Sequence, residues 1–148
     1  MMFIHATKAD LKDCVPCAKA FHEVYDPGVE FCEKSFIDYW ESLLDSDTGF
    51  MILVEHKDGD VVGGAGGVVT NFQTSSVKNS IEMFYWVDPE FRGEVAIKLY
   101  NEFIAESKRR GAKRVLMAYM QNSDPERMKR FYLAKKFVPF EYHMLKNI

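Results

Sequence analysis

The sequence predicts an α+β fold in which strands and helices follow one another in the order β-α-α-β-β-β-α-β-α-β. The hydrophobic pattern changes repeatedly between the short apolar runs of strands and the spacing of amphipathic helices. Gly, Pro and Asp residues separate these segments. Apolar residues make up 47% of the 148 residues, which is enough for the core of one domain. We therefore expect a single domain over residues 1–148, without repeats or linkers.

A short strand at Met2–Ala6 and a helix begin the chain. Asp10 or Asp13 is expected to cap this helix, because a carboxylate can accept hydrogen bonds from free amides at a helix start. The helix ends at Asp26-Pro27-Gly28, since this tripeptide favours a turn.

A second helix is predicted from Glu33 to Leu44 by apolar residues at helical spacing. Three of them are aromatic: Phe36, Tyr39 and Trp40. We expect these three side chains to lie in the core.

A β-hairpin follows the two helices. Phe50–His56 is predicted to be a buried strand, Asp58-Gly59 forms the turn, and Val61–Thr70 returns as the second arm. The run Gly63-Gly64-Ala65-Gly66-Gly67 resembles a phosphate-binding loop, but no helix follows it. Glycines within a strand mark a bulge or the close approach of a neighbour. The second interpretation of these glycines is that they leave open space for a substrate.

The third quarter of the chain predicts a strand and a long helix. Ile81–Val87 follows a polar loop at residues 71–79, and Pro89 cannot extend this strand. The pattern is helical from Arg92 to Arg110, and Gly111 is typical of a residue that ends a helix.

Three elements remain before the C-terminus. A strand is expected at residues 114–120, and a helix is expected to begin at Asp124-Pro125-Glu126. Phe137–Leu145 then forms one bent strand or two short ones.

Composition excludes several classes of protein. The net charge of −3 argues against a nucleic-acid-binding module, and a solvated helix end explains the basic residues at 108–114. No apolar run is long enough to cross a bilayer. The N-terminus lacks the basic leader and apolar core of a signal peptide, and the number of cysteines, three, is odd. We therefore expect a cytoplasmic protein that is not held together by disulfides.

Cys14-Val15-Pro16-Cys17 has the spacing of a thioredoxin-like thiol pair. No tryptophan precedes the pair, and the strand and loop before it are a poor match to the context of a thioredoxin-like site. Two small residues on a helix are the interpretation that we favour, with a thiol oxidoreductase as the alternative. Cys32 and the scattered histidines do not complete a zinc site, so no metal is expected.

A strand feeds a helix through the turn Val87-Asp88-Pro89-Glu90-Phe91-Arg92-Gly93. The first amides of a helix lack intrahelical acceptors, and the helix dipole favours an anion at this end. Such a turn favours a phosphate or pyrophosphate ligand. Many turns of this kind bind nothing, so the geometry alone leaves both possibilities open.

This turn resembles the V-x-P-x-x-R-G turn of the GNAT N-acetyltransferases. The segment Lys108-Arg109-Arg110-Gly111-Ala112 is also similar to the family, and Phe131–Phe137 resembles its Y-x-x-x-G-F segment. The order of the elements agrees over nearly the whole chain. The resemblance implies a mixed, mostly antiparallel central sheet with helices on both faces. It also implies transfer of an acyl group, acetyl in our interpretation, from acyl-CoA to a primary amine by direct attack.

The same resemblance implies where acetyl-CoA binds as a co-substrate. Its pyrophosphate would lie on the backbone amides of Arg92, Gly93, Glu94, Val95, Ala96 and Ile97. Its pantetheine arm would pair with the strand near Tyr85, Trp86 and Val87. The thioester would lie where the next strand splays away, at Val115–Tyr119.

Two residues match the family's catalytic positions. Glu82 lies ten positions before Arg92, where related enzymes often carry a carboxylate base. It would remove a proton from the amine, directly or through water. Tyr132 matches the tyrosine that often protonates the departing CoA thiolate. An exposed strand position for Glu82 and core packing for Tyr132 are the alternatives.

Three residues depart from the family pattern. Val95 and Ile97 replace small residues of the turn, and Lys136 stands where glycine is common. Bulk at Val95 would weaken pyrophosphate binding. The alternative function is therefore a catalytically degenerate GNAT-fold protein that acts through a protein partner.

The sequence leaves the acceptor open, because acceptor specificity on this scaffold lies in the first two helices and the loop at residues 71–79. A protein lysine, a peptide N-terminus, a polyamine and an aminoglycoside all fit. Exposed strand edges would permit a homodimer.

Overall fold

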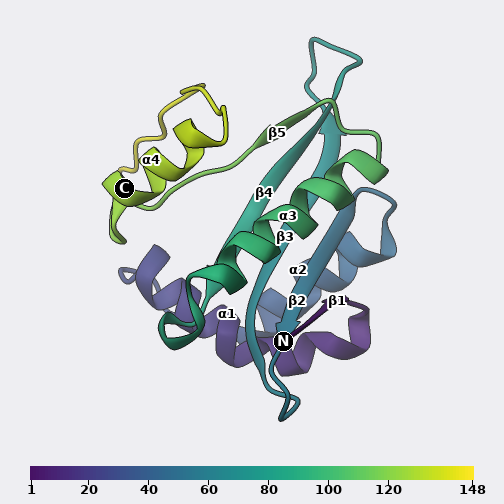
Figure 1. Ribbon diagram of the computed structural model, residues 1–148, viewed down its shortest axis with the longest axis vertical. Helices are drawn as coiled ribbons and strands as arrows, with labels where there is room; N and C mark the ends of the chain where they lie inside the picture. Colours follow the sequence, from purple (N-terminus) through teal and green to yellow (C-terminus); the bar gives the residue numbers. More distant parts are fainter. The chain divides into compact units, whose positions relative to one another are not determined.

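The computed structural model describes residues 1–148, which form two compact units, Met1–Ala118 and Tyr119–Ile148. The first unit contains the sheet and the first three α-helices, and the second contains α4 (Pro125–Ala134) (Figure 1). None of the helices combines the length and the apolar character that crossing a membrane requires.

The first unit is built on a five-stranded sheet whose strands are arranged in chain order. They are β1 (Met2–His5), β2 (Gly49–Glu55), β3 (Val61–Asn71), β4 (Lys78–Val87) and β5 (Arg114–Leu116). The pairs from β1 to β4 are antiparallel, and β4 pairs with β5 in parallel. The prediction of a mixed, mostly antiparallel sheet is confirmed.

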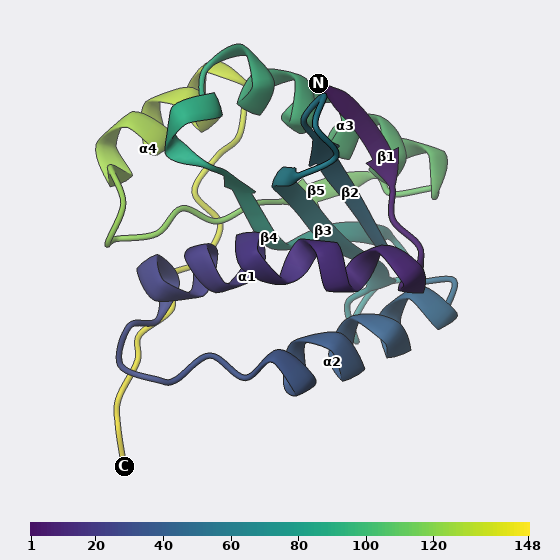
Figure 2. The ribbon, with the colours of Figure 1, turned by 90° about the horizontal axis from the view of Figure 1, so that it is seen from below.

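Helices cover both faces of this sheet. Figure 2 shows α1 (Leu11–Tyr25) and α2 (Glu33–Asp45) on one face and α3 (Glu94–Arg109) on the other. Each face has its own core, because each strand of an antiparallel sheet presents alternate side chains to opposite faces. The arrangement predicted from the sequence is confirmed.

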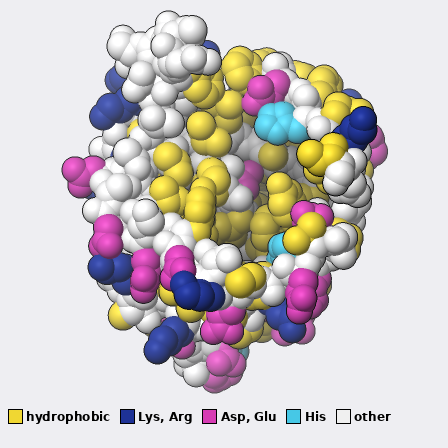
Figure 3. All heavy atoms as spheres, turned by 180° about the vertical axis from the view of Figure 1, so that it is seen from behind, with side chains coloured by type: hydrophobic (Ala, Val, Ile, Leu, Met, Phe, Trp, Pro, Cys, Tyr) yellow, Lys and Arg dark blue, Asp and Glu magenta, His cyan; other side chains and the backbone are white.

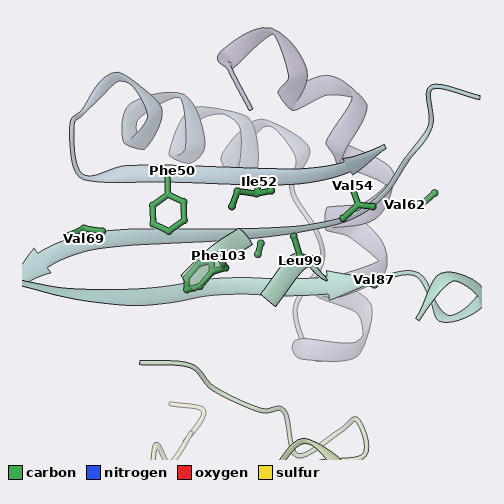
Figure 4. Close-up of a cluster of buried hydrophobic side chains, with 9 residues drawn as sticks. Phe50, Ile52, Val54, Val62, Val69, Val87, Leu99 and Phe103 are labelled. Atoms are coloured by element: carbon green, nitrogen blue, oxygen red, sulfur yellow. The ribbon is translucent and has the colours of Figure 1, made fainter. Parts of the chain in front are cut away.

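The core beneath α3 combines side chains of β2, β3, β4 and the helix. Phe50 of β2 packs against Phe103 of α3 with ring centroids 5.1 Å apart, and Leu99 lies beside them (Figure 4). The core beneath α1 and α2 is built around Trp40 and Phe84, whose rings meet edge to face at 5.5 Å. Burial of these side chains is the main force that holds the helices to the sheet.

The three aromatic residues of α2 differ in their surroundings. Trp40 is buried in the core, and Phe36 is partly buried against it. Tyr39 is 48% exposed, so the prediction of a core position is wrong for this residue. The ring of Tyr39 packs edge to face on Trp40 at 5.8 Å, at the boundary of the core.

Gly111 ends α3 as predicted, whereas the prediction that Asp10 or Asp13 caps α1 is wrong, because no side chain caps this helix and Asp13 lies inside it. Asp10 precedes α1, but its carboxylate accepts hydrogen bonds from the amide and hydroxyl of Thr7, at 2.7 and 2.8 Å. The Asp10 carboxylate therefore stabilises the turn before the helix and accepts no hydrogen bond from the first amides of the helix. Gly111 ends α3 with a φ of 86°, a conformation that favours glycine.

The glycines of β3 mark a close approach of neighbouring side chains. A β-bulge lies at Gly66 and Gly67, where the register of β3 against β4 shifts. A Cβ atom on Gly66 would lie 2.3 Å from the Trp40 ring, and one on Gly67 would lie 2.9 Å from Phe103. Aromatic rings thus fill the space on both faces, and the interpretation as open space for a substrate is wrong.

We expect Gly66→Ala to destabilise the fold, because the added methyl group overlaps the rings of Trp40 and Phe84. Overpacking of a dense core costs about 1–3 kcal/mol, and thermal unfolding monitored by circular dichroism measures it. Gly28→Ala is the control, since its Cβ would meet only Asp26 Oδ1 at 3.8 Å. An unchanged melting temperature of Gly66→Ala would contradict this account of the glycines.

The strand predictions near the C-terminus need correction. The strand expected at residues 114–120 ends at Leu116. The strand or strands expected at Phe137–Leu145 are not formed. Lys136 turns the chain after α4 with a φ of 69°, and Pro139 has no amide hydrogen to donate to a ladder. The apolar and aromatic composition of this segment predicted a strand. A strand also needs a neighbouring strand to pair with, which composition does not reveal.

Two basic residues at the end of α3 form contacts within the chain. Arg109 and Arg110 both donate hydrogen bonds to the buried carboxylate of Glu106. Arg110 also donates to the backbone carbonyls of Asp47 and of Gly49, at the start of β2. On the face opposite α3, acidic and basic side chains are interspersed (Figure 3). These contacts agree with the interpretation of residues 108–114 as a helix end.

Candidate active site

The turn between β4 and α3 presents free backbone amides. A short 3-10 turn at Pro89–Phe91 follows the strand, and α3 begins at Glu94 after Gly93. Gly93 has a φ of 97° and a ψ of −120°, which L side chains rarely adopt. The Ile97 amide donates to Gly93 O at 3.2 Å, so the amides before it form the open end of the helix. This end can hold a phosphate or pyrophosphate.

The side chain of Arg92 ties this turn to the end of β4. Its Nε donates a hydrogen bond to the carbonyl of Val87 at 2.9 Å, and its guanidinium lies 4.8 Å from the centre of the Trp86 ring. The Trp86 indole donates in turn to Asp88 Oδ1 at 2.8 Å. These contacts fix the conformation of the turn that precedes α3.

The two bulky residues of the turn lie in different surroundings. Val95 is partly buried and packs against the core beneath α3, whereas Ile97 is 44% exposed. The bulk of Val95 is therefore taken up by the core. This packing removes the physical argument that Val95 obstructs the amides of the helix end.

Beside this turn, β4 has an open edge. The β4–β5 ladder contains only the pairs Asn79 with Arg114, Ser80 with Val115, and Ile81 with Leu116. Since β5 is the last strand of the sheet, the backbone of Glu82–Val87 has no ladder partner on this side. Such an edge can pair with an extended ligand.

A bulge in β4 determines the side to which Glu82 points. Gly66 pairs with Phe84 and Gly67 with Glu82, so Met83 is an extra residue. The bulge interrupts the alternation of the strand, and nothing in the sequence around Met83 signals it.

Glu82 is a half-buried carboxylate at the point where β4 and β5 part. Burial raises its pKa to about 7, and the hydrogen bond that the Ala118 amide donates to Oε2, at 3.0 Å, limits the rise. The structure therefore differs from the interpretation of Glu82 as a solvent-facing strand residue. A carboxyl with this pKa takes up and releases a proton near neutral pH, as a general base requires.

Tyr132 lies in the second unit, on α4, and is buried. Its ring packs against Phe137 at 5.2 Å, Phe131 at 5.6 Å and Tyr119 at 6.4 Å between centroids. Core packing is thus observed for the ring. The role of its hydroxyl as an acid stays a prediction.

The cysteine pair lacks the properties of a redox site. Cys14 and Cys17 lie on the buried face of α1, and burial raises the pKa of Cys14 to about 12 and that of Cys17 as well. A reactive thiol pair needs the opposite, an exposed thiol with a lowered pKa. The thiol oxidoreductase alternative is therefore wrong. Cys32 is exposed, and a hydrogen bond from Ser35 lowers its pKa.

Comparison with known proteins identifies a family model that matches most of the chain. Residues 16–137 match the model of the acetyltransferase (GNAT) family. No curated protein sequence matches the chain.

Similar solved structures cover almost the whole chain. A probable acetyltransferase shares 18% identity over 100% of this chain and 99% of its own, with a TM-score of 0.79. A predicted acetyltransferase from Clostridium acetobutylicum, solved with acetyl-CoA, shares 16% sequence identity. The match covers 99% of this chain and 95% of the other, with a TM-score of 0.76. An aminoglycoside N-acetyltransferase in complex with CoA shares 15% sequence identity. The match covers 99% of this chain and 93% of the other, with a TM-score of 0.74. At these identities the likeness concerns the fold.

Proposed function

The chain belongs to the acetyltransferase (GNAT) family, and from this premise we propose that it transfers an acetyl group from acetyl-CoA to a primary amine. The observation that carries the proposal is the half-buried carboxylate of Glu82, whose pKa is raised to about 7. It lies on the strand that leads directly into the open helix end of α3. A proton acceptor and an anion site are thus supplied by one continuous segment.

The turn and the open edge of β4 fit the two halves of the cofactor. The amides of Arg92–Ile97 are proposed to bind the pyrophosphate, with α3 directing the positive end of its dipole at it. The backbone of Tyr85–Val87 is proposed to pair with the pantetheine arm. The solved complexes of structural relatives with CoA or acetyl-CoA support this assignment.

The proposed chemistry is a direct transfer. The amine nitrogen forms a bond to the thioester carbonyl carbon, and the bond from this carbon to sulfur breaks. Glu82 takes the proton that the amine loses, directly or through water, and Tyr132 gives its proton to the departing thiolate. Because the family match runs through both compact units, we propose that residues 1–148 act as one domain.

Isothermal titration with acetyl-CoA tests the cofactor assignment, with free CoA and desulfo-CoA as comparison ligands. We expect micromolar binding that Arg92→Glu weakens at least about tenfold, because it places a carboxylate at the pyrophosphate and breaks the bond to Val87 O. Lys108→Glu is the matched control, since it makes the same change of net charge on an exposed residue near the other end of α3.

Absence of binding at millimolar acetyl-CoA would contradict the proposal. The same result would favour the degenerate protein that acts through a partner. Equal effects of the two charge reversals would show that the binding site is not at this turn.

A further inference from the structure

One side chain joins β4 to the first turn of α3. The hydroxyl of Tyr85, near the end of β4, donates a hydrogen bond to the carbonyl of Ala96. Tyr85 also packs against the core beneath α3, so its ring is fixed. The contact therefore links the strand that carries Glu82 with the helix end that carries the free amides.

The hydroxyl of Tyr85 is a lasting donor. Burial, with further contributions from Glu82 and Tyr100, raises the pKa of Tyr85 well above its ordinary value. The phenol consequently keeps its proton across the physiological range. In the helix the Ala96 carbonyl accepts the amide of Tyr100, and its second lone pair remains for the hydroxyl.

The first turn of α3 needs such a contact more than the rest of the helix does. Helix ends fray, because their outermost groups lack one partner of the helical ladder. Gly93, directly before the helix, has no side chain to pack, and Ile97 in the first turn is 44% exposed. Val95 and Ala96 pack against the core beneath α3, and the hydrogen bond from Tyr85 adds a directional contact that fixes this turn relative to β4.

We infer that Tyr85 is a positioning residue for the cofactor, whose hydroxyl holds the first turn of α3 against β4 in the orientation that binds pyrophosphate. The inference rests on the proposed function. Its physical basis is that amides held in place lose less conformational entropy when an anion binds. Tyr85 thereby acts through its side chain, apart from any pairing of its backbone with the pantetheine arm.

A second contact between the same two elements supplies a matched control. The hydroxyl of Ser107 donates to Ser80 Oγ at 2.7 Å and also joins α3 to β4, near the other end of the helix. Both atoms belong to fully buried residues. Loss of this contact weakens the attachment of α3 without touching the turn.

The test compares Tyr85→Phe and Ser107→Ala with the unmodified chain. We expect Tyr85→Phe to raise the dissociation constant of CoA about fivefold, the effect of one lost buried hydrogen bond. Ser107→Ala is expected to lower the melting temperature but to leave CoA affinity within about twofold. S-acetylpantetheine, which lacks the pyrophosphate, is expected to bind all three proteins equally in an NMR titration.

Hydrogen exchange gives a readout that needs no ligand. Amides at residues 94–97 are expected to exchange faster in Tyr85→Phe and unchanged in Ser107→Ala. Equal CoA affinities of the two variants, or unchanged exchange in Tyr85→Phe, would overturn the inference while leaving the proposed function intact. Failure of the unmodified chain to bind CoA would instead overturn both.

Discussion

Replacing Glu82 with Gln is expected to lower kcat by about 10²- to 10⁴-fold, the usual contribution of a general base. Gln has nearly the same shape but cannot accept the proton of the amine. Affinity for acetyl-CoA is expected to stay within about twofold, because the proposed pyrophosphate site lies on the turn. Transfer to a panel of acceptors (a lysine peptide, an alanine N-terminal peptide, spermidine and kanamycin) measures the rate.

The pH dependence identifies the group responsible. Since the base acts only when ionised, activity is expected to rise with pH and to level off above about 7, the pKa that burial gives Glu82. A carboxyl in water would place this rise near its ordinary value of 4.5. Glu102 is an exposed residue of α3, so Glu102→Gln should keep the pH profile of activity. Glu82→Gln should lose the rise of activity with pH.

Stability gives a readout that does not depend on the acceptor. The pKa of Glu82 is raised in the folded chain, so the folded chain holds this proton more tightly than the unfolded chain does. The resulting stabilisation is present below about pH 4.5 and is lost as the pH rises through about 7. Glu82→Gln should remove this decline in the free energy of unfolding. A decline of equal size in the variant would show that another group causes it.

Turnover of two variants tests the catalytic roles proposed for Glu82 and Tyr132. If Glu82→Gln and Tyr132→Phe each leave turnover intact, neither assignment holds. Loss of turnover in Glu82→Gln alone would support Glu82 as the base and contradict Tyr132 as the acid that protonates the thiolate.

The elements set by local signals could be predicted from the sequence. The Asp58-Gly59 turn joins β2 and β3, and Gly111 ends α3, because each depends on the backbone preferences of a few neighbouring residues. The strand, turn and helix around Gly93 also follow the prediction. In these segments the chemistry of a few adjacent residues decides the conformation.

Features that need distant contacts could not be predicted. Burial by the surrounding chain raises the pKa of Glu82, and a hydrogen bond from the Ala118 amide, 36 positions further along the chain, limits this rise. The glycines of β3 have their reason in Trp40 and Phe103, which approach from opposite faces. In each case the cause is a packing partner that sequence spacing does not reveal.

Gly93→Ala is expected to weaken CoA binding by about 5- to 150-fold. A side chain at a φ of 97° costs about 1–3 kcal/mol of strain. The free chain relieves this strain by moving the turn, and binding must then restore the geometry that presents the amides of α3. Isothermal titration with CoA measures the loss.

Gly59→Ala is the matched control for this strain. Gly59 has a φ of 90° in the β2–β3 turn, and an added Cβ at either glycine would meet no atom within 4 Å. Both substitutions should therefore lower the melting temperature by similar amounts, for the same backbone reason. Only Gly93→Ala should lose CoA affinity, because only Gly93 precedes the open helix end. Normal CoA binding by a destabilised Gly93→Ala would mean that the pyrophosphate does not depend on this turn.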